Sequence, residues 1–221
     1  MRKTHKYAWG TMVLASVGLL LASVFKYAPL DLTEVLGFIT GAACVLLVVE
    51  QNIWNFPIGI ANNIFFIILF FTSRLYGDMV LQTVYIVLAA IGWYQWIYGG
   101  KNRTRLKITH TSIREIAILV IIGIVATAAM HKYFQQINDS APFLDAFTTV
   151  LSLIAQYLLN CKRIENWYVW IMADLLYIWL YLQKDLNLTA ILYAIFIGMC
   201  IAGLLTWFRA YRHQQNEGMA Q

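Results

Sequence analysis

Charged residues are scarce in this sequence. Asp, Glu, Lys and Arg together make up 12% of its 221 residues, whereas they are about 25% of a typical soluble domain. Hydrophobic residues make up 61%, and the mean hydropathy is +0.65. So few charges do not give a surface suited to water. The composition therefore excludes a soluble domain and predicts a polytopic membrane protein.

Cysteine and histidine are rare too. The three cysteines lie far apart and form no CxxC pair, at Cys44, Cys161 and Cys200. The four histidines fall in predicted loops or tails, at His5, His110, His131 and His213. This pattern indicates no disulfide framework, no zinc site and no histidine proton relay inside the membrane. The glycine pair at 99–100 lacks the spacing of a phosphate-binding loop, so we expect neither a metal nor a cofactor.

Apolar runs of membrane-spanning length recur along the chain. Eight are predicted, near residues 8–25, 33–49, 56–73, 79–98, 113–131, 143–160, 165–182 and 188–208. Aromatic residues near the ends of two spans are typical of an interfacial belt, namely Trp93, Tyr94, Trp96 and Trp207. The predicted fold class is an all-α polytopic membrane protein with eight transmembrane helices.

Positive residues are distributed unevenly between the loops. With the N-terminus in the cytoplasm, the cytoplasmic side holds Arg2, Lys3, Lys6, Lys101, Arg103, Arg105, Lys107, Arg114, Lys162, Arg163, Arg209 and Arg212. The opposite side holds Lys26, Arg74, Lys132 and Lys184. This asymmetry follows the positive-inside rule, so the net charge of +5 is explained without a nucleic-acid partner. We expect both termini to be cytoplasmic.

The segment 165–182 carries an acid near the middle of a predicted span. At about 100° per residue, Trp167, Trp170 and Asp174 share one helix face, and Tyr177 continues it. A carboxylate at the bilayer centre costs at least about 2.5 kcal/mol, so Asp174 should face a cavity or the bundle interior. An acid beside two indoles favours a pocket for a flat, polar or cationic molecule. The alternative is that the tryptophans pack or lie at the interface, while Asp174 bonds a neighbouring helix.

Isolated polar side chains in other spans are further candidates for this pocket. They are Asn55 and Asn62 on one face of the third span, Gln82 and Tyr85 on one face of the fourth, and Gln156 in the sixth. An amide within the membrane must bond either a substrate or a neighbouring helix. Both interpretations stay open for these residues.

The second to fourth spans resemble the sixth to eighth. At a shift of 112 residues, Asn55 aligns with Trp167 and Asn62 aligns with Asp174. One spacer helix separates the two units, so both enter the membrane from the same side and the repeat is parallel. Parallel repeats in transporters favour a substrate site between the halves.

Four short motifs together resemble one family. They are Asn55-Phe-Pro-Ile-Gly-Ile-Ala-Asn62, Leu75-Tyr-Gly-Asp-Met-Val-Leu-Gln82, Gly92-Trp-Tyr-Gln-Trp96 and Glu165-Asn-Trp-Tyr-Val-Trp-Ile-Met-Ala-Asp174. The combination is similar to the PnuC family of bacterial vitamin transporters, over roughly residues 34–208. The family's WxxWxxx(N/D) motif maps onto Trp167, Trp170 and Asp174, here with Asp in the last position.

The resemblance implies a fold and an assembly. The family has a SWEET-like pair of parallel three-helix bundles joined by a linker helix, and it forms homotrimers. The expected segments are an N-terminal cytoplasmic segment with a peripheral helix, a first bundle, a cytoplasmic loop with the linker helix, a second bundle and a cytoplasmic tail. Their expected bounds are 1–32, 33–98, 99–142, 143–208 and 209–221.

The resemblance also implies a function. Family members carry nicotinamide riboside, thiamine or riboflavin by facilitated diffusion, and a cytoplasmic kinase traps the vitamin. We therefore expect a nicotinamide riboside transporter of the bacterial inner membrane that serves NAD biosynthesis, with thiamine and then riboflavin as alternative substrates. An integral membrane enzyme or a receptor is the alternative from another class. An enzyme would need a cluster of His, Cys or paired acids near one membrane face, which the sequence lacks.

Overall fold

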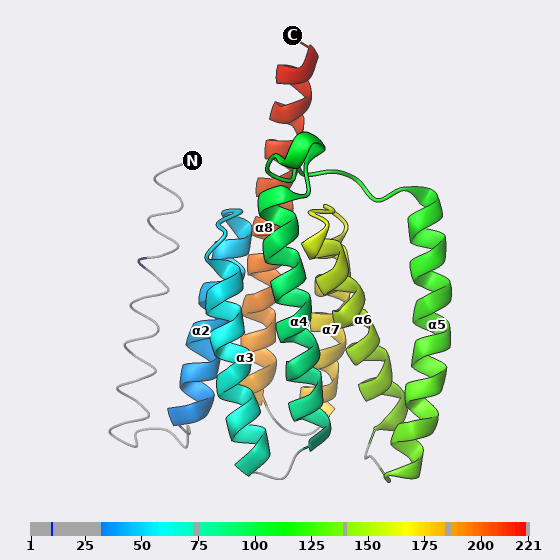
Figure 1. Cartoon of the computed structure of the whole chain (residues 1–221). Coiled ribbons are helices and arrows are strands. Elements are labelled where there is room, and N and C mark those ends of the chain that lie inside the picture. Colours follow the sequence, from blue (N-terminus) through cyan, green and yellow to red (C-terminus); the bar gives the residue numbers. More distant parts are fainter. Residues whose placement is uncertain (1–9, 11–31, 73–75, 139–140, 184–186, 220–221) are drawn as a thin grey trace. The chain divides into compact units, whose positions relative to one another are not determined.

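The computed structural model describes residues 10, 32–72, 76–138, 141–183 and 187–219. The helices in these ranges are α2 (Leu32–Val49), α3 (Asn55–Thr72), α4 (Tyr76–Tyr98), the short 3₁₀ helix η1 (Lys101–Arg103), α5 (Ile113–Gln136), α6 (Pro142–Asn160), α7 (Asn166–Gln183) and α8 (Asn187–Met219). The α-helices are labelled in Figure 1. Seven of the predicted spans therefore correspond to helices. The first predicted span, 8–25, lies outside the described residues apart from residue 10.

Several of these helices have the character of membrane spans. Four of the described helices contain segments long and apolar enough to cross a membrane, namely Met79–Tyr98, Ile113–Gln136, Pro142–Asn160 and Tyr193–Glu217. Helix α7 is less apolar, because it carries Asp174 and six Trp or Tyr residues. The chain is thus an all-helical, multi-pass membrane protein.

The chain divides into two compact units, Met1–Ala90 and Ile91–Gln221, with the boundary inside α4. In the first unit α2 packs against α3. Thr40 Oγ1 on α2 donates to Asn62 Oδ1 on α3 at 3.0 Å. One turn earlier, Gly37 lets the two backbones approach, because a methyl group there would overlap the ring of Phe66. A small residue and a polar bond thus join these helices, as is common in membranes.

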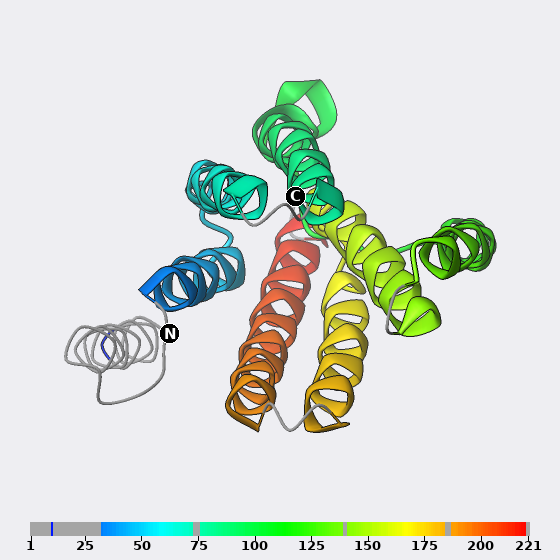
Figure 2. The ribbon, with the colours of Figure 1, turned by 90° about the horizontal axis from the view of Figure 1, so that it is seen from below.

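In the second unit each helix packs on the next in chain order, α5 on α6, α6 on α7 and α7 on α8. Figure 2 shows this succession from green through yellow to red. The central contacts use small side chains, and Ala146, Ala155 and Ala173 are all 0% exposed. Helix α7 therefore lies between α6 and α8, and this position buries two of its sides.

Two helices run further than the sequence predicts. Helix α5 continues five residues beyond the predicted end at His131, so this histidine lies within a helix and not in a loop. Its ring contacts Phe143 edge to face at 5.8 Å. Helix α8 continues through the predicted tail to Met219, where His213 and Glu217 pair at 3.2 Å across one turn. The apolar pattern ends at the membrane surface, whereas the hydrogen bonds of a helix can continue beyond it.

The turns that follow α2 and α6 have the same backbone conformation. Gln51 and Lys162 each take a left-handed conformation, with φ of 55° and 49°. In both turns the next residue donates its N–H to the carbonyl five residues earlier, at 2.8 Å. These bonds form the Schellman motif that ends a helix. The repeat is therefore visible in the backbone, even though neither turn has glycine at the left-handed position.

Side-chain bonds fix the register of this repeat at 111 residues. Asn55 Nδ2 donates to the carbonyl three residues earlier at 2.7 Å, and Asn166 Nδ2 makes the equivalent bond at 2.5 Å. The alignment at a shift of 112 residues is therefore wrong by one residue. Side-chain similarity alone favours that shift, because the sequence does not reveal the geometry of the turns. At the correct register the counterpart of Asp174 is Asn63 and not Asn62.

Candidate functional site

Helix α7 turns its polar stripe toward its neighbours. Trp167 and Asp174 are 1% and 6% exposed, and both contact α8. The opposite side of the helix exposes Tyr168, Leu175 and Trp179, which tolerate lipid. Asp174 thus faces the bundle interior, as the cost of a charge in lipid predicted.

Three indoles pack together at one end of the second unit. The ring of Trp207 lies 5.5 Å from that of Trp167 at 87°, and 5.9 Å from that of Trp96. Edge-to-face contacts of this kind are favourable between aromatic rings. Trp96 and Trp207 are 2% and 0% exposed, so their prediction as interfacial residues is wrong. Trp93 and Tyr94 are exposed, as residues of an interfacial belt would be.

Gly203 on α8 makes room for the ring of Trp167. A Cβ at this position would overlap three carbon atoms of the indole. Because an indole packed against Trp207 has little freedom to move, overpacking of this kind typically destabilises by about 1–3 kcal/mol. The close approach of α7 and α8 therefore depends on glycine at this position.

We predict that Gly203→Ala lowers the thermal stability of the purified protein by about 1–3 kcal/mol. The matched control is Gly198→Ala on the same helix, where nothing lies within 4 Å of the added Cβ. That substitution should be neutral or stabilising, because alanine is the better helix former. Melting temperatures in detergent measure both effects. Equal stability of the two variants would contradict the packing described for Trp167.

Asp174 has a hydrogen-bond donor on α8. The thiol of Cys200 donates to Asp174 Oδ2 with an S–O distance of 3.7 Å. Cys200 is 5% exposed, so the contact is shielded from solvent. No group of three or more His, Cys, Asp or Glu that could hold a metal ion occurs among the described residues. The site is therefore a carboxylate with a weak donor beside aromatic rings.

Trp170 and Tyr177 lie on the same stripe of α7 but are less enclosed, since both are half-buried. By helical geometry they fall between the side that carries Trp167 and Asp174 and the side that carries the buried Ala173. The ring of Tyr177 lies 4.9 Å from that of Tyr193 on α8. Of the two tryptophans in the motif, Trp170 is thus the more accessible to a ligand.

Gln156 bonds within its own helix. Its Nε2 donates to Asn160 Oδ1 one turn later on α6, at 3.0 Å. Gln156 is half-buried and Asn160 is 3% exposed. A side-chain amide has two donors and one acceptor oxygen, so this bond leaves Gln156 with capacity for a further partner.

The four candidates of the first unit have different surroundings. Asn55 is 6% exposed and caps the turn before α3, which is a structural role that the sequence did not indicate. Asn62 accepts from Thr40, so inter-helix bonding explains at least its carbonyl oxygen. Gln82 and Tyr85 are half-buried on α4.

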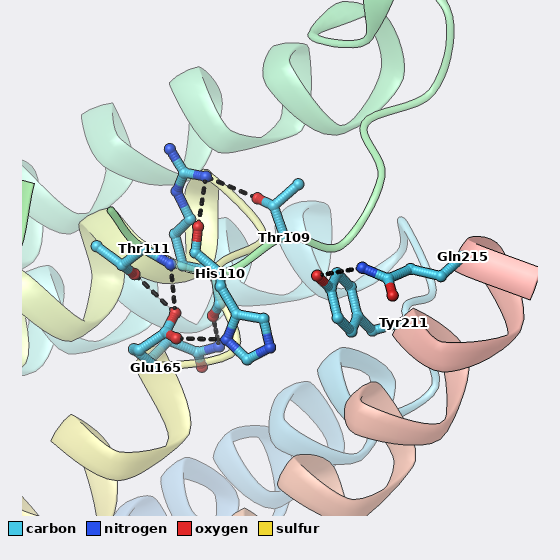
Figure 3. Close-up of polar contacts among 8 residues, drawn as sticks. Thr109, His110, Thr111, Glu165, Tyr211 and Gln215 are labelled. Atoms are coloured by element: carbon cyan, nitrogen blue, oxygen red, sulfur yellow. Dashed lines mark hydrogen bonds and ion pairs between the residues drawn. The ribbon is translucent and has the colours of Figure 1, made fainter. Parts of the chain in front are cut away.

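The loop before α5 is bonded to the turn between α6 and α7, and Figure 3 shows the contacts of Glu165 with His110 and Thr111. The backbone N–H of Thr109 donates to Lys162 O, and Ile164 N–H donates to Thr109 O, both at 3.1 Å. Glu165 accepts from the Thr111 hydroxyl and binds His110 Nδ1, each at 2.7 Å. These polar contacts fix the position of the first residues of α7. They thereby also fix where the aromatic stripe lies along the helix axis.

Two charged residues of the same turn are also held in place. Arg163 pairs with Glu115 on α5 at 2.9 Å. The ammonium of Lys162 lies 4.4 Å from the ring centroid of Trp96, an arrangement that favours a cation. Burial, together with the nearby charge of Arg105, lowers the pKa of Lys162 to about 8. These contacts could not be predicted from the sequence, because their partners lie far apart along the chain.

Comparison with known proteins decides the family. The model of the nicotinamide mononucleotide transporter family matches residues 31–209. The chain belongs to this family. The match includes the whole range, roughly residues 34–208, over which the sequence motifs resemble PnuC proteins, so that resemblance is confirmed. Since the family is one of transporters, the expectation of a transporter and not an enzyme is confirmed as well.

Individual relatives carry different vitamins. The chain is 25% identical to the nicotinamide riboside transporter PnuC of Escherichia coli, with 85% of this chain and 89% of the relative covered. It is 24% identical to the PnuC of Neisseria mucosa, with coverage of 89% and 79%. It is also 24% identical to the riboflavin/roseoflavin transporter RibM of Streptomyces davaonensis, with coverage of 83% and 88%. Identity alone therefore does not choose between these substrates.

A solved structure shares the fold. The crystal structure of the vitamin B3 transporter PnuC superposes with a TM-score of 0.70 at 23% sequence identity. The superposition covers 94% of this chain and 92% of that one. The described part of the chain thus shares the fold of that structure.

Proposed function

We propose that this protein carries nicotinamide riboside into the cell by facilitated diffusion, and that a cytoplasmic kinase traps the vitamin. The family gives the transport class, but its members include carriers of a neutral vitamin. The observation that supports the choice of a cation is the buried carboxylate of Asp174 on the aromatic stripe of α7.

Charge separates the three candidate vitamins. Nicotinamide riboside and thiamine each carry a fixed positive ring, whereas riboflavin is neutral. A cation beside Asp174 offsets part of the desolvation cost of the carboxylate, which a neutral ring cannot do. Amide side chains at other positions suit the hydroxyl groups of a ribose and a carboxamide, which favours nicotinamide riboside. Thiamine is the second candidate, because its charge satisfies the same carboxylate.

The residues that we propose to contact the substrate are those that the sequence predicted. They are Asn55, Asn62, Gln82, Tyr85, Gln156, Trp167, Trp170, Asp174 and Tyr177. Within this set the half-buried ring of Trp170 is the best placed to stack on an aromatic ligand, and the enclosed ring of Trp167 supports the helix contact behind it.

We also propose the finer architecture that the family implies. It has eight transmembrane helices, with a SWEET-like pair of parallel bundles, α2–α4 and α6–α8, joined by α5 as the linker helix. The matching turns after α2 and α6 support this repeat. We further propose that the protein is a homotrimer of the bacterial inner membrane with both termini in the cytoplasm. The distribution of Lys and Arg supports the orientation of the termini.

Uptake should need no external energy. We predict that purified protein in liposomes equilibrates labelled nicotinamide riboside without any ion gradient, because the sequence predicts neither a phosphate-binding loop nor a histidine relay inside the membrane. The internal concentration should rise to the external value and stop there. A kinase with ATP sealed inside should raise total uptake well above that plateau. Accumulation of free vitamin on imposing a proton or sodium gradient would overturn facilitated diffusion.

A further inference from the structure

Cys200 is set apart from the other two cysteines by its partner. Its thiol donates to a carboxylate oxygen of Asp174 at 3.7 Å, and both residues are more than nine-tenths buried. By contrast, the thiol of Cys44 donates to the backbone carbonyl of Asn55 at 3.8 Å. Among the described residues, Cys200 is the side chain that donates to Asp174. The orientation of this carboxylate thus depends on α8 as well as on its own helix.

A thiol is an unusual choice for this position. A buried carboxylate normally takes strong donors such as hydroxyl, amide or guanidinium groups, which disperse its charge. A thiol is a weak donor, and it engages one of the two oxygens. The contact therefore orients the carboxylate but neutralises little of its negative charge, which another partner can then balance. A fixed positive ring is a partner of that kind.

We propose that Cys200 is a positioning residue for the cationic substrate, acting through Asp174. Its thiol holds Oδ2 against α8, so that the other oxygen is presented to the positive ring. This inference rests on the proposed function, because it requires a cationic substrate at Asp174. It predicts that the chemical group at position 200 controls selectivity for charge and not only the stability of the α7–α8 contact.

A double-mutant cycle tests this coupling. Cys200→Ala and the bulkier Cys200→Val both remove the donor, and each should weaken binding of nicotinamide riboside by about threefold to tenfold, the scale of one weak hydrogen bond. Cys200→Ser keeps a donor and should retain affinity. In an Asp174→Asn background the same changes at position 200 should have little further effect. Binding of neutral riboflavin should not respond to the donor at all.

The control is Cys161→Ala, because Cys161 is the half-buried residue that caps the C-terminus of α6 and is not among the residues proposed to contact the substrate, so removal of its thiol should leave the affinity unchanged. Melting temperatures of every variant separate binding effects from loss of fold. If Cys200→Ala and Asp174→Asn act additively, or if Cys200→Ser binds as weakly as Cys200→Val, the positioning role is wrong while the transporter assignment stands. Failure of the unmodified protein to bind nicotinamide riboside would instead overturn the proposed function, and this inference with it.

Discussion

Replacing Asp174 by asparagine is expected to lower the affinity for nicotinamide riboside by about tenfold to a hundredfold, while the fold is retained. The reason is that a charged contact becomes a neutral one, a change worth about 1–3 kcal/mol. Asparagine has nearly the same shape, and its oxygen can still accept from the thiol of Cys200. Titration of purified protein with the vitamin measures the affinity, and a melting curve reports the fold.

Glu217→Gln is the matched control, since Glu217 is exposed near the end of α8 and pairs only with His213 among the described residues. That variant should bind as the unmodified protein does. Undiminished affinity in Asp174→Asn would mean that the carboxylate serves the contact between α7 and α8 and not the substrate.

The two tryptophans of the motif are expected to respond differently to removal. Trp167 is 1% exposed and packs on Trp207, so Trp167→Ala should lower stability by about 3–5 kcal/mol, as large core truncations do. Trp170 is only half-buried. Trp170→Ala should therefore leave melting nearly unchanged but weaken binding by about 1–3 kcal/mol, the scale of stacking on an aromatic ring.

Phenylalanine at either position should be milder than alanine, because a ring is kept. Melting temperature and affinity measured on the same four variants separate the two roles. If Trp167→Ala melts like the unmodified protein, the packing assigned to it is wrong. If Trp170→Ala keeps full affinity, Trp170 only packs within the protein and does not bind the substrate.

Side-chain patterns predicted the helices and the orientation of Asp174. Apolar runs give the spans directly, and the energetic cost of a carboxylate in lipid leaves the bundle interior as its place. The partner on α8 was not predictable, because nothing in the sequence links Asp174 to Cys200. Likewise Trp207, at the end of an apolar run, has the pattern of an interfacial residue until its packing against Trp167 is seen.

The repeat shows a second limit of the sequence. Its register depends on left-handed residues at Gln51 and Lys162, and neither is the glycine that would mark such a position. The contacts of the α6–α7 turn are unpredictable for a similar reason. Glu165 in this turn bonds His110 and Thr111, and Thr109 bonds the backbone of the turn, so the partners lie more than fifty positions apart and local propensity does not encode them.

The relative affinities of the three vitamins for the unmodified protein show whether Asp174 selects a cationic substrate. Purified protein is titrated with nicotinamide riboside, thiamine and riboflavin separately, and the dissociation constants are compared at one pH and one salt concentration. We expect both cations to bind more tightly than riboflavin, with nicotinamide riboside the tightest. Riboflavin binding more tightly than both cations would contradict the assignment of Asp174 as the residue that selects the substrate.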